Sequence, residues 1–78
     1  MSGRVEMEVL KYIAEKAEQN EFYGVSAKEV VSVFGRRAYM TLIRLQKKGY
    51  IERILHGFYR PTKKGIEFLN HVNGEVVG

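Results

Sequence analysis

Two glycines, Gly35 and Gly49, constrain the middle of this chain more than any other feature, because each ends a short helical pattern. The stretch between them reads RRAYMTLIRLQKK, in which apolar residues recur at helical spacing. We therefore predict a two-turn helix over 27–33, a break at Gly35 and a longer helix over 36–48. A short helix, a turn containing glycine and a longer helix together form a helix-turn-helix.

The start of the first of these helices carries three local signals. Ser26 is a good N-cap, and Glu29 three residues later completes a capping box. Val25 before the cap and Val30 after it have the spacing of a hydrophobic staple. Because these signals agree, we expect the helix to begin directly after Ser26.

Amphipathic patterns and a hairpin signal flank this pair of helices. Residues 4–19 place an apolar arc opposite glutamate and lysine side chains, which predicts a first helix, and EFYGV over 21–25 predicts a short extended segment. Residues 50–61 have β-rich runs on both sides of a His-Gly turn, which predicts a β-hairpin. Pro61 ends the hairpin, and Thr62 is placed to cap a last helix that begins with KKGIEFLNHV.

The predicted fold class is α+β and mostly helical, in the order helix, short strand, helix, helix, β-hairpin, helix. With 78 residues the chain suffices for one domain, which we assign to 1–78 with 74–78 as a frayed tail. The chain contains no cysteine, so the hydrophobic core has to stabilise the domain without disulfide bonds. No apolar run reaches the roughly 18 residues of a membrane span and no signal peptide is recognisable, so we expect a cytoplasmic protein without a membrane partner.

Positive charge is concentrated in the middle of the chain. Nine of the 13 Lys and Arg residues fall within 33–64, where Glu52 is the only acidic residue. The segments before and after this block are mildly acidic. Such a distribution indicates a surface that binds a polyanion.

The predicted helix over 36–48 has two faces at about 100° per residue. The apolar side, which we expect to be buried, consists of Ala38, Leu42 and Leu45. The opposite side carries Arg36, Arg37, Met40, Arg44 and Lys47. Tyr39 and Ile43 lie at the edge of the apolar stripe, and the favoured interpretation is that both pack against the first helix.

Two stretches carry a resemblance to a known family: VSAKEVVSVFGRRAYMTLIRLQKKGYIER and, after it, FYRPTKKGIEFL. Together they resemble the winged helix-turn-helix domain of prokaryotic transcriptional regulators, the class that includes MarR-like and PadR-like proteins and small stand-alone regulators of archaea and their viruses. KKGYI leads from the second helix into the wing, and YRPTKKG is similar to the family's Y-x-L-T-x-x-G, with Pro61 where Leu is frequent. The resemblance covers about residues 4–70.

The resemblance implies that the helix over 36–48 lies in the major groove of double-stranded DNA, with the 50–61 wing on the backbone or in the minor groove. The candidates for reading base edges are Arg36, Arg37, Met40 and Arg44. Contacts to phosphates or from the wing are expected from Ser26, Lys47, Lys48, Arg53, His56, Arg60, Lys63 and Lys64. We expect a sequence-specific transcriptional regulator, and a repressor rather than an activator because no segment is left over to recruit polymerase.

A homodimer is expected, because one module this small would bind a specific site weakly whereas two copies would read a palindrome. The first and last helices carry no basic cluster, so we expect the dimer contact there, with Phe68, Leu69 and Val72 as candidates. Phe22 and Tyr23 fit the core or the dimer surface.

Other functions share parts of this pattern. A non-specific architectural protein that binds nucleic acid would have the same charge distribution, and a winged helix used for protein contact would have a neutral or mixed apolar outward face. Catalysis is not expected, because the chain has no Asp or Cys, two distant His residues and no glycine-rich phosphate loop. We expect no cofactor, no metal site and no small-molecule effector.

Overall fold

The structure is a computed structural model, which describes the backbone of residues 2–20 and 24–77 and the side chains of 4–20 and 24–72. Its elements are α1 (Ser2–Glu18), β1 (Val25–Ser26), α2 (Ala27–Phe34), α3 (Ala38–Lys47), β2 (Ile51–Leu55), β3 (Phe58–Pro61) and α4 (Lys63–Val77). Within the described residues the fold is therefore α+β and mostly helical, as predicted. Its four helices and its antiparallel sheet, of strand order β1-β3-β2, are compatible with a winged-helix arrangement.

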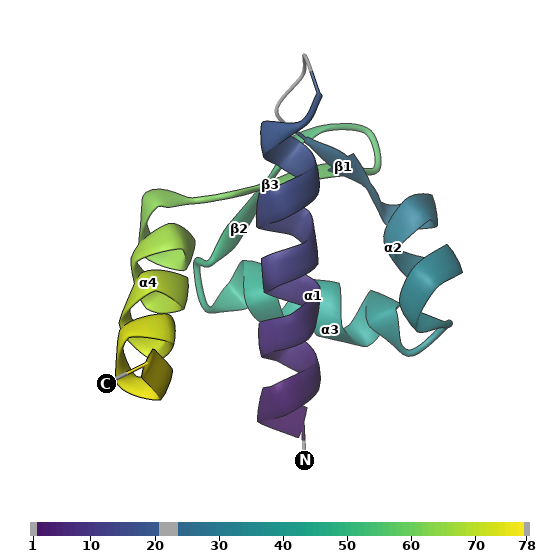
Figure 1. Cartoon of the computed structure of the whole chain (residues 1–78). Coiled ribbons are helices and arrows are strands. Elements are labelled where there is room, and N and C mark those ends of the chain that lie inside the picture. The colour runs from purple at the N-terminus through teal and green to yellow at the C-terminus, as the bar shows by residue number, and fades with distance from the viewer. Residues whose placement is uncertain (1, 21–23, 78) are drawn as a thin grey trace.

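Helix α1 lies at the centre of the molecule and contacts every other helix (Figure 1). In this view α4 lies on its left, α2 on its right and α3 behind it, and the sheet covers its upper end. α1 contributes five residues to the core: Ala14, which is 8% exposed, and four without exposed surface, Val9, Leu10, Ile13 and Ala17. The apolar arc predicted for the first helix is thus the centre of the hydrophobic core.

The start of α2 confirms the cap at Ser26. Its Oγ accepts a hydrogen bond from the Glu29 backbone amide at 3.1 Å, and its own backbone is extended. The Glu29 carboxylate does not complete the capping box, because it accepts a hydrogen bond from the Tyr12 hydroxyl of α1 at 2.7 Å. Burial raises the pKa of Tyr12 to about 12, and the hydrogen bond and charge of Glu29 add to the shift.

We expect Ser26→Ala to lower the free energy of unfolding by about 1 kcal/mol, because it removes the acceptor for an otherwise unpaired amide at the helix start. Urea unfolding followed by circular dichroism measures the loss. Ser32→Ala is the matched control, since Ser32 is exposed in the body of α2. Equal midpoints for the two variants would show that the cap contributes nothing.

Helix α3 begins at Ala38, two residues later than predicted. Gly35 has a positive φ of 94°, and Arg36 and Arg37 form a turn before the helix. The amides of Ala38 and Tyr39 bond to the carbonyls three residues earlier, of Gly35 and Arg36, as in a tight 3₁₀ turn. The N-cap position is held by Arg37, whose side chain accepts no amide hydrogen bond, so nothing local extends the α-helix back to residue 36.

The end of α3 and the hairpin agree with the prediction. Gly49 has a φ of 82°, and the amide of Tyr50 donates to the carbonyl of Leu45 at 2.9 Å, which closes the helix end. β2 and β3 pair antiparallel around the turn at His56 and Gly57, with a register shift between residues 53 and 55.

Thr62 caps α4, as predicted. Its Oγ1 accepts a hydrogen bond from the Gly65 amide at 3.1 Å and donates to the Gly49 carbonyl at 2.6 Å, so the cap also ties α4 to the end of α3. The helix continues through Val77, where we expected a frayed tail from residue 74; residue 78 lies outside the described residues.

Two features are not found in the part of the chain that the structure describes. No helix there has both the length and the hydropathy needed to cross a bilayer. No group of three or more His, Cys, Asp or Glu side chains there is arranged to hold a metal ion.

Candidate nucleic-acid interface

The inner face of α3 is the stripe predicted from its spacing. Ala38, Leu42 and Leu45 are each at most 2% exposed, and Thr41 is buried beside them. This face packs against α1 and α2. The opposite face of the helix is consequently directed away from the core.

The outward face of α3 is more apolar than predicted. Tyr39 is 51% exposed, Met40 55% and Ile43 47%. The interpretation that Tyr39 and Ile43 pack against the first helix is therefore wrong. α1 covers the side of α3 that carries Leu42 and Leu45, and one straight helix cannot cover two sides of its neighbour. We call Tyr39, Met40 and Ile43 the apolar patch of α3.

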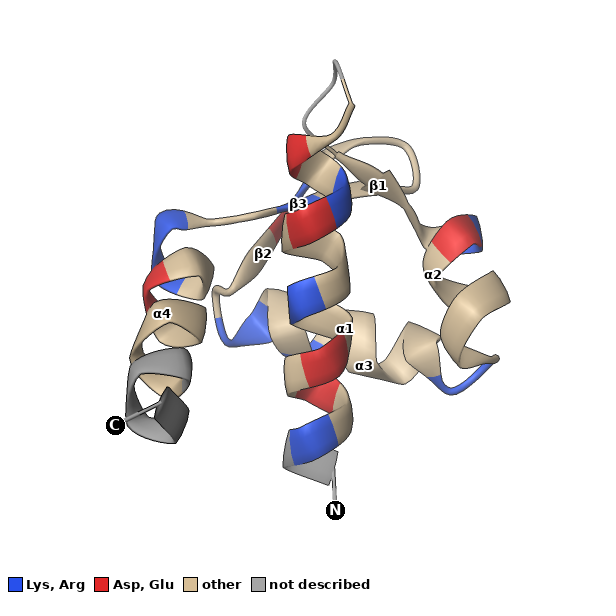
Figure 2. Ribbon diagram, in the orientation of Figure 1, with Lys and Arg blue, Asp and Glu red and all other residues tan. Residues whose placement is uncertain are grey.

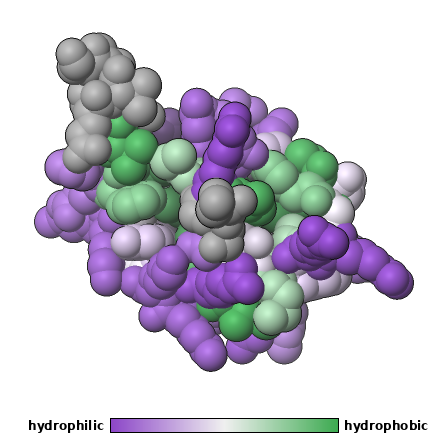
Figure 3. Space-filling model, turned by 90° about the horizontal axis from the view of Figure 1, so that it is seen from below, coloured by the Kyte–Doolittle hydropathy of each residue, from purple (hydrophilic) through white to green (hydrophobic). Residues whose placement is uncertain are grey.

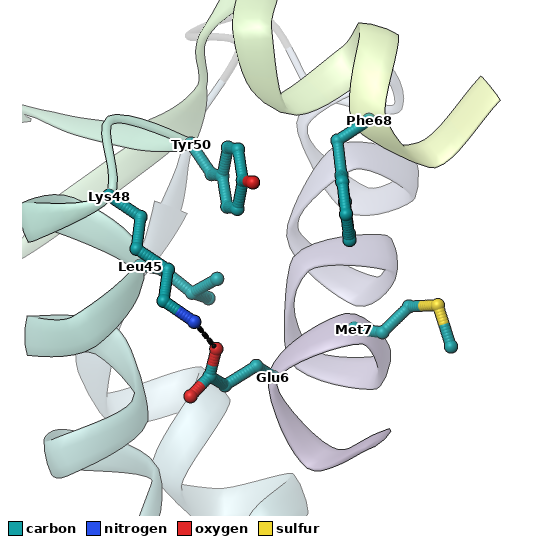
Figure 4. Close-up of a pocket in the computed structure, with 6 residues that line it drawn as sticks. All are labelled: Glu6, Met7, Leu45, Lys48, Tyr50 and Phe68. Carbon is teal, nitrogen blue, oxygen red and sulfur yellow. Dashed lines mark hydrogen bonds and ion pairs between the residues drawn. The ribbon is translucent and has the colours of Figure 1, made fainter. Parts of the chain in front are cut away.

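Two of the predicted DNA-contacting cations lie on the α1 side of α3. Lys48 Nζ donates a hydrogen bond to Glu6 Oε1 at 2.5 Å (Figure 4), and Arg44 Nη1 lies 4.0 Å from Glu6 Oε2. The Glu6 side chain is only 10% exposed, so these two cations compensate a carboxylate that has lost most of its water. Through these ion pairs, Arg44 and Lys48 link α3 to α1.

Sequence reasoning missed Glu6, although a signal was present. Glu6 precedes Val9, Leu10 and Ile13 by three, four and seven residues, so it lies on the apolar arc of α1. A carboxylate on a buried arc needs a cationic partner, and the nearest basic block follows in α3. The spacing therefore indicated a partner for Glu6 without identifying it. Glu6 and Lys48 also line a cavity of about 150 Å³ between α1, α3 and α4, whose other walls are Met7, Leu45, Tyr50 and Phe68 (Figure 4).

The remaining predicted cations are distributed over several parts of the molecule. Arg60 pairs with Glu52 at 2.8 Å across the hairpin, and Lys64 Nζ lies 5.5 Å from the centre of the Tyr50 ring. Figure 2 shows the basic start of α4, which holds Lys63, on the side of the molecule opposite the basic turn before α3. The basic block of the sequence is thus not one continuous surface.

Nine exposed cations form no ion pair with any residue in 4–20 or 24–72, and four of them, Lys11, Lys16, Lys63 and Lys64, lie on α1 and α4. The other five lie beside the outward face of α3 or in the elements next to it: Lys28, Arg36, Arg37, Lys47 and Arg53. Arg36 and Arg37 lie at the start of α3, and Lys47 lies one turn beyond Ile43, with which it lines a shallow hollow. We call these five residues the free cations.

A groove of about 660 Å³ lies between α2, α3 and the hairpin. Its walls are formed by Ser26, Ala27 and Lys28 at the start of α2, by Tyr39 of α3, and by Arg53, His56, Gly57, Phe58 and Tyr59 of the hairpin. The predicted phosphate and wing residues Ser26, Arg53 and His56 thus share one groove. Lys28 was not predicted, because it belongs to the acidic first part of the sequence; its place in the first turn of α2, two residues after the cap, was the available signal.

The residues predicted to form the dimer contact pack largely against other residues of the same chain. Leu69 is 8% exposed and belongs to the core, and the Phe68 ring stacks on the Tyr50 ring at a centroid distance of 4.8 Å. Val72 is half-buried on α4. Phe22 and Tyr23 lie outside the described residues.

No protein-family model, curated protein or solved structure matches this chain.

Proposed function

We propose that this protein is a winged helix-turn-helix protein that binds double-stranded DNA as a sequence-specific transcriptional regulator, acting as a repressor. In this proposal α3 enters the major groove, and the β2–β3 hairpin is the wing. The observation that supports it most is the position of the free cations, which border the outward face of α3 and the groove beside it. Cations without acidic partners at such a face favour a polyanionic ligand over a solvated surface.

The free cations divide into two roles under this proposal. Arg36 and Arg37 precede the first turn of α3, the part of a recognition helix that meets base edges, and the fork of arginine matches guanine O6 and N7. Lys28, Lys47 and Arg53 are placed to contact phosphates on either side. Arg44, proposed from the sequence as a base reader, is assigned a structural role with Glu6 instead.

The experiment is a salt titration of DNA binding. On a labelled duplex of random sequence, which offers no preferred bases, we expect all five free cations to contact phosphates. Anisotropy readings from about 50 to 300 mM salt should then give a slope of about −4.5 for log K against log salt. A slope near zero would contradict DNA binding through this face. Selection from random duplexes then distinguishes the two nucleic-acid functions, since a regulator enriches a motif and an architectural protein does not.

A second candidate function, contact with another protein, is favoured by the exposure of the apolar patch of α3. A winged helix used in this way was expected to have a mixed apolar outward face. The salt titration separates the two, because a protein partner held by the patch predicts no strong affinity for random duplex DNA.

A further inference from the structure

The centre of the outward face of α3 has few groups that read guanine. Its apolar patch is flanked by Gln46 and Lys47 toward the helix end, while Arg44 is paired with Glu6 on the other side of the helix. Guanine recognition in the major groove requires hydrogen-bond donors, which the patch itself offers only through the Tyr39 hydroxyl. The middle of α3 is therefore suited to an apolar feature of its ligand.

The charges around the patch indicate which kind of ligand carries that feature. Arg36 and Arg37 lie at one end of the patch and Lys47 at the other, none of them paired with an acid in the described part of the chain. Seen from below, the surface shows hydrophobic patches bordered by hydrophilic side chains (Figure 3). An apolar centre with cations at both ends is complementary to a polyanion that presents apolar groups between its charges.

Duplex DNA has one such group in its major groove, the C5-methyl of thymine. We propose that the apolar patch of α3 reads thymine methyl groups, so that the duplex bound by this protein is rich in A·T pairs at the centre of each half-site. This inference rests on the proposed function and names its preferred ligand. From Tyr39 to Ile43 the helix rises about 6 Å, which is the length of about two base-pair steps.

The test compares duplexes that differ only in the 5-methyl group. The two probes are an alternating A·T duplex and the same DNA duplex with deoxyuridine in place of thymidine, called the A·U duplex, which presents the same hydrogen-bonding groups. Each methyl group lost from an apolar contact should lower the affinity about fourfold. We expect the A·T duplex to bind about tenfold or more tightly than the A·U duplex in anisotropy titrations. A G·C duplex should in turn gain affinity when its cytosines carry a 5-methyl group.

The variant Met40→Ala/Ile43→Ala assigns the effect to the patch. Both side chains are about half exposed, so the substitution is expected to leave the thermal midpoint nearly unchanged. The ratio of A·T to A·U affinity should fall toward one in this variant. Val5→Ala is the matched control, because Val5 is similarly exposed but lies on α1; it should keep the parental ratio.

Three outcomes would overturn the inference. Equal affinities for the A·T and A·U duplexes, with the steep salt dependence retained, would leave DNA binding intact and remove the role of the methyl groups. An unchanged ratio in the double variant would place methyl reading elsewhere on the protein. Loss of self-association by the double variant in sedimentation, with unaltered DNA affinity, would assign the patch to a second copy of the chain. If no duplex binds at all, the proposed function itself is contradicted, and the inference falls with it.

Discussion

Replacing Arg36, Arg37 and Lys47 with alanine is expected to weaken binding to duplex DNA by about two to three orders of magnitude at 0.1 M salt. On duplex DNA of random sequence we expect each of the three cations to contact a phosphate and to release close to one counterion, which at this salt concentration corresponds to about an eightfold change in affinity. All three side chains are exposed, and none forms an ion pair with a residue that the structure describes, so the fold should not depend on them.

One measurement on this triple variant, compared with a matched control, tests the expectation. Anisotropy titrations over a range of salt should show a slope smaller by about 2.7, since three contacts are lost. The matched control is Arg4→Ala/Lys11→Ala/Lys16→Ala, which removes the same charge from exposed positions of α1. If both triple variants lose affinity equally, net charge rather than the face of α3 governs binding, and the interface is wrongly placed.

Gly65→Ala is expected to destabilise the protein by roughly 2 kcal/mol or more. Helix propensity alone favours alanine over glycine in a helix by up to about 1 kcal/mol. At position 65, however, a Cβ would overlap the Tyr50 carbonyl oxygen and lie 3.0 Å from its carbonyl carbon. The Tyr50 carbonyl cannot easily move, because it accepts a hydrogen bond from the Thr62 amide at 2.9 Å. Overpacking against fixed backbone costs about 1–3 kcal/mol or more, so the overlap outweighs the gain in propensity.

Urea unfolding of this variant measures the balance of the two effects. Asn70→Ala, at an exposed position of the same helix, is the control and should be neutral or slightly stabilising. An alanine at position 65 that left stability unchanged or raised it would show that α4 does not approach the end of α3 as closely as described. The prediction thus tests the packing of α4 against the end of α3, where the Tyr50 and Phe68 rings stack.

The predictions that held are those that depend on a few consecutive residues. The cap at Ser26, the helix end at Gly49 and the hairpin turn at His56 and Gly57 were predicted from residue types that set the backbone conformation or bond backbone groups within five residues. The start of α3 was misplaced for a related reason. Arginine carries no acceptor that would cap a helix, so the sequence offered no signal to separate Arg36 and Arg37 from the helix that follows.

The candidate site depended more strongly on distant contacts. Periodicity identified the buried stripe of Leu42 and Leu45 correctly, yet it placed Tyr39 and Ile43 at the edge of that stripe, and the favoured interpretation that both pack against the first helix was wrong. Large apolar side chains are found both in cores and on exposed faces, so their type does not decide the matter. The position of α1 decided it, and that position follows from the packing of the whole core.

The sequence by itself determined the order of the elements, their turns and the inner face of α3, because local hydrogen bonds and helical periodicity act over a few residues. Only the tertiary structure decided which cations are free. All three of Arg44, Lys47 and Lys48 belong to the same basic stretch of the sequence, but α1 brings the carboxylate of Glu6 to Arg44 and Lys48 and leaves Lys47 without an acidic partner among the described residues. A charge separated by some forty residues from its partner acts through space, so its effect appears only once the core has fixed where the helices lie.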